Sequence, residues 1–213
     1  MSDPTPRWRR RKDARPQEIL EAALICFAAK GFAATRMDDI ADRAGVTKGT
    51  IYLYFQNKEA VFKALVRESI GTQIGQVLEQ AQAFQGPAAD LLWMVISTVG
   101  QILSSTDRVV LPKIIVAEAG NFPELARFYR EEIIDKGLGA MSAVIARGIE
   151  RGEFREVDPQ HAARLCVAPV LLAAVWRTTF AQFDAAPYDY SGFLQTHLDV
   201  LLRGLSPVGD ASP

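Results

Sequence analysis

Apolar residues recur at intervals of three and four along almost the whole chain from residue 16 onward. This spacing places them on one face of a helix, as in the first such segment, which carries Ile19, Leu20, Ala23, Leu24 and Phe27. No segment combines sustained period-two alternation with the turn residues that join β-strands. The sequence therefore predicts an all-α protein with about nine helices.

Glycine, proline and capping residues divide this pattern into separate helices. We expect them at residues 16–30, 35–44, 47–55, 57–84, 88–104, 107–119, 122–151, 159–183 and 190–204. Gly31 is expected to end the first helix in a left-handed conformation, and Thr35 begins a capping-box-like motif at the second. Thr47, Asn57 and Asp158 are expected N-caps, because their side-chain oxygens accept hydrogen bonds from otherwise unpaired backbone N–H groups.

The charges are unevenly divided along the chain, although the formal net charge is only -1. Residues 1–70 contain 13 Lys and Arg against 9 Asp and Glu, whereas residues 71–213 contain 11 against 16. A basic front joined to an acidic rear indicates two functional units, of which the first can face an anion. The hydrophobic share of 49% supports a substantial core and excludes long disordered or collagen-like architecture.

No targeting or membrane-spanning segment is expected in this sequence. The basic N-terminus is followed by charged residues and not by the apolar stretch of a signal peptide. The longest apolar run, Leu165–Trp176, contains a proline and is shorter than the ~20 residues that span a bilayer. Cys26 and Cys166 lie in apolar stretches, which suits buried thiols in a reducing compartment. We therefore expect a cytoplasmic protein without a membrane partner.

Residues 35–58, with the sequence TRMDDIADRAGVTKGTIYLYFQNK, carry the most informative pattern. Two short helices joined by a tight Ala-Gly-Val turn form a candidate helix-turn-helix unit. Because Ile51 and Phe55 are expected in the core, the exposed side or end of the second helix is expected to carry Lys48, Gly49, Thr50, Tyr52 and Tyr54. Lysine and threonine reach base edges or phosphates, and tyrosine hydroxyls donate to phosphate oxygens. The pattern predicts binding to double-stranded DNA, and the alternative is a helical packing unit with solvated tyrosines.

This stretch resembles the DNA-binding domain of the TetR/AcrR family of transcriptional regulators from about Arg15 to Thr72. The resemblance is carried by Phe27-Ala28-Ala29-Lys30-Gly31-Phe32, Ala34-Thr35, Ile40-Ala41, Ala44-Gly45-Val46-Thr47-Lys48-Gly49-Thr50-Ile51-Tyr52, Tyr54-Phe55 and Lys58-Glu59-Ala60. The resemblance implies phosphate contacts by Thr35, Tyr52, Tyr54 and Lys58. It also places Arg36, Lys48, Gly49 and Thr50 at or near the bases, with Thr47 at the start of the recognition helix.

Residues 110–180 are similar to one C-terminal subgroup of the same family. The similarity is carried by Val116-Ala117-Glu118-Ala119, Phe122-Pro123-Glu124-Leu125-Ala126 and Phe128-Tyr129. In that family the C-terminal half builds a helical ligand pocket, and the last two long helices build a homodimer interface. The resemblance therefore implies a homodimer, whose candidate contacts are Phe180, Phe193, Leu194, His197, Val200 and Leu201.

Aromatic and charged residues of the C-terminal half are candidates for a small-molecule site. The aromatic candidates, for which ordinary core packing is the alternative, are Trp93, Phe122, Phe128, Tyr129 and Trp176. Glu118 and Arg177 each interrupt an apolar face, so they bind a ligand or pair with each other. The apolar, acidic surroundings favour a small hydrophobic effector. No cofactor or metal is expected, because His161 and Asp158 have no further clustered ligands beside them.

The expected organisation is a basic arm (1–14), a DNA-binding domain (15–74), a regulatory, ligand-binding and dimerisation domain (75–205) and a tail (206–213). The arginine-rich run at residues 7–12 either enters the minor groove or is a solvated tail. Together these patterns predict a sequence-specific regulator, most readily a repressor that its ligand releases from the operator. An activator or broad DNA binder of the same fold is the alternative. An all-helical enzyme or carrier is disfavoured, because the sequence lacks G-x-S-x-G, H-E-x-x-H and Walker motifs.

Overall fold

The computed structural model describes residues 7–105 and 107–207, which form helices and their connections. The helices are α1 (Arg7–Ala34), α2 (Met37–Arg43), α3 (Lys48–Tyr54), α4 (Lys58–Val66), α5 (Thr72–Ala83), α6 (Ala88–Ser105), α7 (Val110–Glu118), α8 (Pro123–Tyr129), α9 (Asp135–Glu150), α10 (Pro159–Thr179) and α11 (Tyr190–Leu205). A first π turn (Arg67–Gly71) joins α4 to α5, and a second π turn (Arg130–Ile134) joins α8 to α9. Within the described residues the chain therefore has the nine helical segments that the sequence predicts, since two of them run through a π turn.

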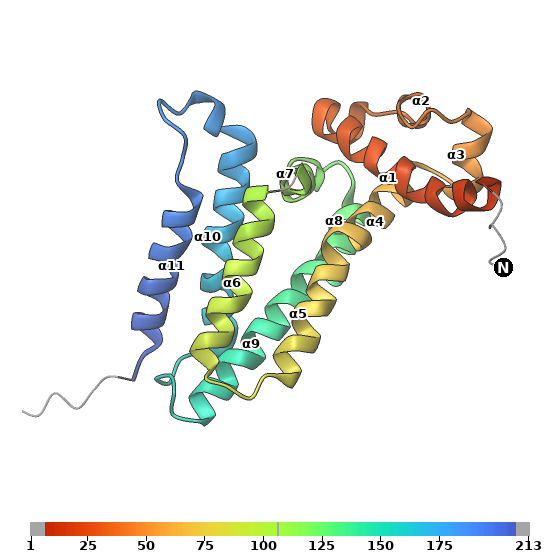
Figure 1. Ribbon diagram of the computed structural model, residues 1–213. Helices are drawn as coiled ribbons and strands as arrows, with labels where there is room; N and C mark the ends of the chain where they lie inside the picture. Colours follow the sequence, from red (N-terminus) through yellow and green to blue (C-terminus); the bar gives the residue numbers. More distant parts are fainter. Residues whose placement is uncertain (1–6, 106, 208–213) are drawn as a thin grey trace, which may run out of the picture.

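Figure 1 shows two groups of helices connected by one long segment. The helices α1, α2 and α3 lie together at one end of the molecule, at the upper right of the view. The helices α6, α9, α10 and α11 pack alongside one another in the other group. The α4–α5 segment runs from the first group along the second, and α7 and α8 lie between the groups. The arrangement separates a small unit containing the candidate helix-turn-helix from a larger helical bundle.

Two clusters of buried apolar side chains hold these groups together. The first joins α1, α2, α3 and α4 with α7 and α8, around the packed rings of Phe27, Phe32 and Phe62. The second lies between α6, α9, α10 and α11 and includes Leu92 and Ile145. The helices α7 and α8 thus share a core with the N-terminal helices, while the expected domain boundary near residue 74 stays a prediction.

The two long segments contain their π turns where the two cores meet. The turns lie against each other, and the guanidinium Nη2 of Arg67 is 3.4 Å from Oε1 of Glu132 across the contact. In the α8–α9 segment, Phe128 precedes the turn and belongs to the first core, whereas Met141 follows it and belongs to the second. Each segment therefore contributes to both cores.

Helix α1 differs from the expected first helix at both ends. It begins at Arg7, so residues 7–14 of the expected arm are helical, and residues 1–6 lie outside the described part of the chain. Arginine, lysine and alanine favour helix there, and Pro16 removes one backbone hydrogen bond without ending the helix. At the other end Gly31 has the expected positive φ, 76°, and one further turn follows it up to Ala34.

Among the described helices, α10 matches a membrane span in length and hydropathy, and 33% of its apolar stretch is buried inside the protein. The apolar run Leu165–Trp176 is too short for a span, as the sequence indicates, but the helix that contains it extends from Pro159 to Thr179. The core helix of a water-soluble protein meets the same criterion. Here one face of α10, which includes Cys166 and Val170, packs into the second core.

Candidate nucleic-acid interface

Helices α2 and α3 are joined by a turn that their sequence explains. Gly45 has a φ of 63°, which favours glycine, and the Val46 N–H donates to the Ala41 carbonyl at 3.0 Å. The side chain of Thr47 then caps α3 as expected, because its hydroxyl oxygen accepts from the Thr50 N–H at 3.2 Å. Together with the fully buried side chain of Ile51, these contacts fix the orientation of α3 relative to α2.

The exposed face of α3 consists of Lys48, Gly49, Tyr52 and Leu53. These positions are three or four residues apart, so they share one side of the helix, opposite the buried Ile51. Tyr52 is 45% exposed and Leu53 is 83% exposed. The α3 face therefore presents one lysine, one phenol and one leucine around a glycine.

Two residues expected on this face lie elsewhere, and one residue of the face is not among those expected. The Thr50 hydroxyl is 2.8 Å from that of Thr47, and Tyr54 packs against the first core, so both are only partly exposed. Leu53 is absent from the predicted set, because apolar residues of a short helix are expected in its core. The signal is present nevertheless, since Leu53 follows Gly49 by four residues and is out of register with Ile51.

Lys48 is held at the surface by a neighbouring helix. Its Nζ lies 3.0 Å from Oδ2 of Asp38 in α2, and that hydrogen bond raises the pKa of the lysine. Both side chains are more than half exposed, so water and salt screen their attraction. Lys48 can therefore exchange this carboxylate for another acceptor at little cost while it remains positively charged.

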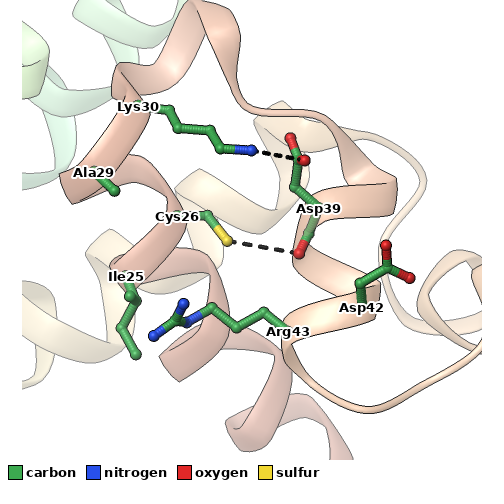
Figure 2. A pocket seen from close by; sticks show the side chains of 7 residues that line it. All are labelled: Ile25, Cys26, Ala29, Lys30, Asp39, Asp42 and Arg43. Atoms are coloured by element: carbon green, nitrogen blue, oxygen red, sulfur yellow. Dashed lines mark hydrogen bonds and ion pairs between the residues drawn. The ribbon is translucent and has the colours of Figure 1, made fainter.

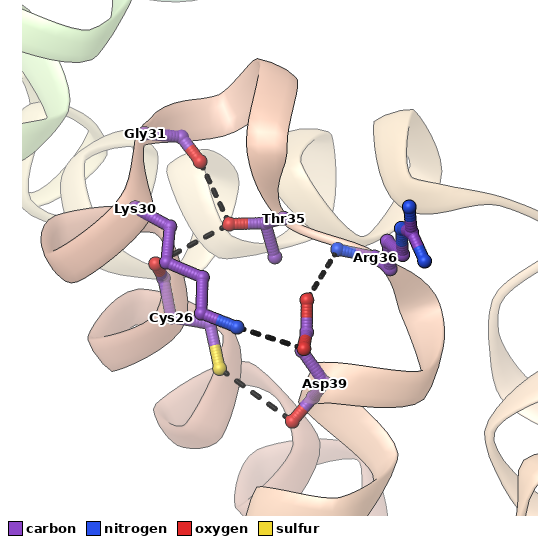
Figure 3. A network of polar contacts seen from close by, with 6 residues as sticks. All are labelled: Cys26, Lys30, Gly31, Thr35, Arg36 and Asp39. Carbon is purple, nitrogen blue, oxygen red and sulfur yellow. Dashed lines mark hydrogen bonds and ion pairs between the residues drawn. The ribbon is translucent and has the colours of Figure 1, made fainter.

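The side chain of Thr35, for which a phosphate contact is predicted, points into the protein. It is only 1% exposed, and its hydroxyl donates to the carbonyls of Gly31, at 2.7 Å, and Cys26, at 3.3 Å (Figure 3). The N-cap position of α2 belongs to Arg36, one residue later than expected. The hydroxyl is thus used to hold the kinked end of α1 against α2.

Arg36 and Lys30 share one carboxylate at the start of α2. The Arg36 N–H donates to Oδ2 of Asp39 at 2.9 Å, and the Lys30 Nζ donates to Oδ1 at 2.8 Å (Figure 3). The bond from Lys30, followed by that from Arg36, lowers the pKa of Asp39. The side chain of Arg36 is exposed beside α2, and its contact with the bases stays a prediction.

Lys58, for which a phosphate contact is predicted, has internal hydrogen-bond partners in the structure. Its Nζ donates to the carbonyl oxygens of Phe32, at 2.6 Å, and Ala33, at 2.9 Å. The ammonium group lies 4.5 Å from the centroid of the Phe32 ring, and burial lowers the pKa of the lysine. Lys58 therefore satisfies the carbonyl groups that the end of α1 leaves unpaired.

A shallow depression lies between α1 and α2 on the same unit. Figure 2 shows its lining, which consists of Ile25, Cys26, Ala29, Lys30, Asp39, Asp42 and Arg43. The Cys26 thiol is 3.7 Å from the backbone oxygen of Asp39, and burial raises its pKa. Cys26 and Cys166 are both buried free thiols, as expected. The groups at the base of the depression bond to each other and join the two helices.

Two of the expected ligand-binding residues instead join the two groups of helices. Oε1 of Glu118, at the end of α7, accepts from the Ala33 N–H at 3.0 Å. The Phe122 ring packs edge-on against the Phe32 ring, with the centroids 4.8 Å apart. The carboxylate of Glu118 is bonded to the end of α1, and the expectation that it binds a ligand or pairs with Arg177 stays a prediction.

The remaining ligand candidates are spread over the bundle. Phe128 and Tyr129 are buried in the first core, where burial raises the pKa of Tyr129. Trp93 is exposed on α6, and the indole of Trp176 donates to Asp184 at 2.9 Å near the end of α10. A ligand site formed by these residues together with Arg177 stays a prediction.

The candidate dimer contacts divide into exposed and internal residues. Phe180 and Val200 are exposed, and their place in a dimer interface stays a prediction. Leu194 is buried against α6, next to Gly100, so its assignment to an interface is wrong. Nε2 of His197 is 3.0 Å from the carbonyl oxygen of Cys166 in α10. The two remaining candidates, Phe193 and Leu201, pack against the second core.

Comparison with known proteins matches both halves of the chain. Residues 19–65 match the family model described as bacterial regulatory proteins, tetR family. Residues 86–187 match the model described as a tetracyclin repressor-like C-terminal domain. The chain is also 28% identical over 196 residues to the fatty acid metabolism regulator protein of Bacillus subtilis (strain 168), covering 91% of this chain and 98% of the relative.

Solved structures agree with these matches. The transcriptional regulator FadR from Bacillus subtilis, in complex with stearoyl-CoA, has a TM-score of 0.72 at 25% identity over 89% of this chain and 98% of its own. The SmeT–triclosan complex has a TM-score of 0.77 at 26% identity over 92% and 93% of the two chains. The chain belongs to the TetR family of helix-turn-helix transcriptional regulators, which is a family of DNA-binding proteins and not of enzymes.

Proposed function

We propose that this regulator is a cytoplasmic repressor that binds its operator as a homodimer and leaves it when a small hydrophobic ligand binds the C-terminal domain. The observation that carries the proposal is the α3 face, where Lys48 and Tyr52 stand exposed on a rigidly capped helix. A lysine and a phenol in this position can donate to base edges and phosphates in a major groove.

An exposed apolar face on α10 supports the homodimer. Leu165, Leu172 and Trp176 recur at intervals of seven and four on that helix, and the first two are 66% and 58% exposed. Covering the exposed part of each leucine side chain with protein contributes roughly 1–2 kcal/mol, about two thirds of the value for full burial. A second copy that covers this face, together with Phe180 and Val200, would hold two α3 helices at a fixed separation.

The proposed ligand class is supported by relatives. Two related structures hold stearoyl-CoA and triclosan, both of which carry apolar groups. A ligand can release DNA only by binding more tightly to the conformation that does not fit the operator. The contact of Glu118 and Phe122 with the end of α1 gives a route for such coupling, because it joins the C-terminal helices directly to the DNA-binding unit.

The DNA-binding part is tested by a gel shift with the intergenic DNA upstream of the protein's own gene. Wild-type protein should bind with an affinity that falls steeply with salt concentration. The double variant Lys48→Ala, Tyr52→Ala should bind much more weakly, whereas Lys136→Ala, an exposed lysine on α9, should bind as wild type. Equal binding by wild type and the double variant at every salt concentration would refute the proposal.

The dimer and the sign of regulation need separate measurements. Leu172→Glu should give a monomer by light scattering and should lose operator binding, because it places a charge in the proposed interface. Val116→Glu, a similarly exposed apolar position on α7, is the matched control and should remain dimeric. Expression of a reporter under the bound promoter should rise when the gene is deleted, and a fall would identify an activator.

A further inference from the structure

We propose that Leu53 reads the 5-methyl group of thymine in the major groove, and that it sets the sequence preference of this regulator at one position of each half-site. The inference rests on the proposed operator binding and adds a specificity-determining residue to it. Leu53 is not among the DNA contacts expected from the sequence, and none of those expected contacts is a purely apolar side chain.

The position of Leu53 carries the inference. It is 83% exposed, although leucine is usually removed from water in a small helical unit. A single exposed leucine is ordinary, but this one lies on the α3 face one turn after Gly49, at the edge of that face and near the C-terminal end of the helix. The opposite side of the same helix, at Ile51, is completely buried. The leucine therefore points away from its own core, on the side that faces the DNA.

The surroundings of Leu53 leave room for a base edge. A methyl group added at Gly49 would meet only the Thr47 hydroxyl, at 3.9 Å, so the surface one turn before the leucine is open. Lys48 and Tyr52 supply polar groups on the neighbouring side of the same face, which can bind phosphates or base acceptors. The α3 face thus has an apolar side, formed by Gly49 and Leu53, beside a side with hydrogen-bonding groups.

The chemistry of leucine then selects the partner. Leucine donates and accepts no hydrogen bond, so it cannot read a polar base edge or hold a phosphate. The apolar group that a base pair presents in the major groove is the thymine 5-methyl. Removing one methyl-sized contact from water corresponds to about a four-fold change in affinity for each half-site, and to about fifteen-fold for two.

Selection from a random duplex library defines the operator preference directly from binding. The library is bound to wild-type protein, to Leu53→Ala and to Gln56→Ala, a control at an exposed position beyond the end of α3. Wild type and Gln56→Ala should enrich a thymine at the same position of each half-site, and Leu53→Ala should lose that preference. Thermal unfolding of all three proteins should agree, because Leu53 lies outside both cores.

Deoxyuridine then isolates the methyl group, since it differs from thymidine only by that group. Replacing the selected thymine by deoxyuridine should weaken wild-type binding by about four-fold for each half-site and should leave Leu53→Ala unaffected. Equal wild-type affinity for the two duplexes, or an undiminished deoxyuridine effect in Leu53→Ala, overturns the inference while operator binding stands. Failure of wild type to enrich any sequence overturns both this inference and the proposed function.

Discussion

Replacing Lys58 by methionine separates an internal role for this lysine from a contact with DNA. Methionine keeps the apolar stem, but the carbonyl groups of Phe32 and Ala33 lose their donor. Hydrogen bonds to a charged group contribute about 1.5–3 kcal/mol, and the position over the Phe32 ring adds about 0.5–1 kcal/mol. We therefore expect the free energy of unfolding to fall by about 2–4 kcal/mol, which lowers Tm by roughly 4–16 °C for a chain of this size.

Calorimetry at fixed protein concentration measures the loss of stability, and DNA binding over a series of salt concentrations measures the phosphate contacts. A lost phosphate contact reduces the slope of log K against log salt by about 0.9. Lys58→Met should leave this slope unchanged in the protein that remains folded. Lys48→Met is the matched control and should reduce the slope without lowering Tm, because that side chain is exposed. A Lys58→Met variant with wild-type Tm and a reduced slope would refute the reasoning.

Three further substitutions test other contacts. Thr35→Val keeps the shape of the side chain but leaves the Gly31 carbonyl without its donor, so urea titration should show a loss of about 1–3 kcal/mol. Gly148→Ala places a methyl group against Phe154 and should cost about 1–3 kcal/mol in the same assay, whereas Gly137→Ala on the same helix meets no atom within 4 Å and should be neutral or stabilising. The pKa of Asp39 is lower in the folded state, so its stabilisation is complete above about pH 4 and is lost as the pH falls through that lower value. Asp39→Asn should therefore weaken the dependence of Tm on pH in acid.

The outcomes that contradict these predictions are distinct. Wild-type stability of Thr35→Val combined with weaker DNA binding would show that the hydroxyl acts through a phosphate contact and not through its bonds to the end of α1. Equal losses for the Gly148 and Gly137 variants would show that packing against Phe154 does not decide the effect. An unchanged acid profile for Asp39→Asn would show that the bond from Lys30 contributes no pH-dependent stability.

Local features are predictable from the sequence because they depend on neighbouring residues. Helical spacing, the positive φ of Gly31 and the caps at Thr47, Asn57 and Asp158 all depend on groups within a few positions along the chain. The same applies to the helix-turn-helix, whose two helices are separated by a short turn. The predicted start of α1 is wrong because Pro16, which often marks a boundary, lies within the helix.

Several residues of the predicted site have hydrogen-bond partners far away in the sequence, which the sequence analysis does not anticipate. Lys58 at the start of α4 bonds to carbonyl groups at the end of α1, 25 and 26 residues earlier in the chain, and Glu118 bonds to the Ala33 N–H, 85 residues away. No local pattern distinguishes such a lysine or glutamate from one that faces DNA or a ligand. The same reason applies to Leu194, since α11 carries apolar side chains on more than one side and only its packing against α6 selects the buried ones.

The two π turns have a consequence for how one helix can serve two cores. A π turn holds one residue more than an α turn, so the side chains beyond it are rotated by about 100° around the axis. Apolar side chains that face the first core before the turn can therefore be followed by apolar side chains that face the second core, although the helix is not interrupted. Where the DNA-binding and regulatory parts meet, the extra residue in each π turn therefore sets the direction in which the following side chains point. That direction depends on the number of residues in the turn as much as on their types.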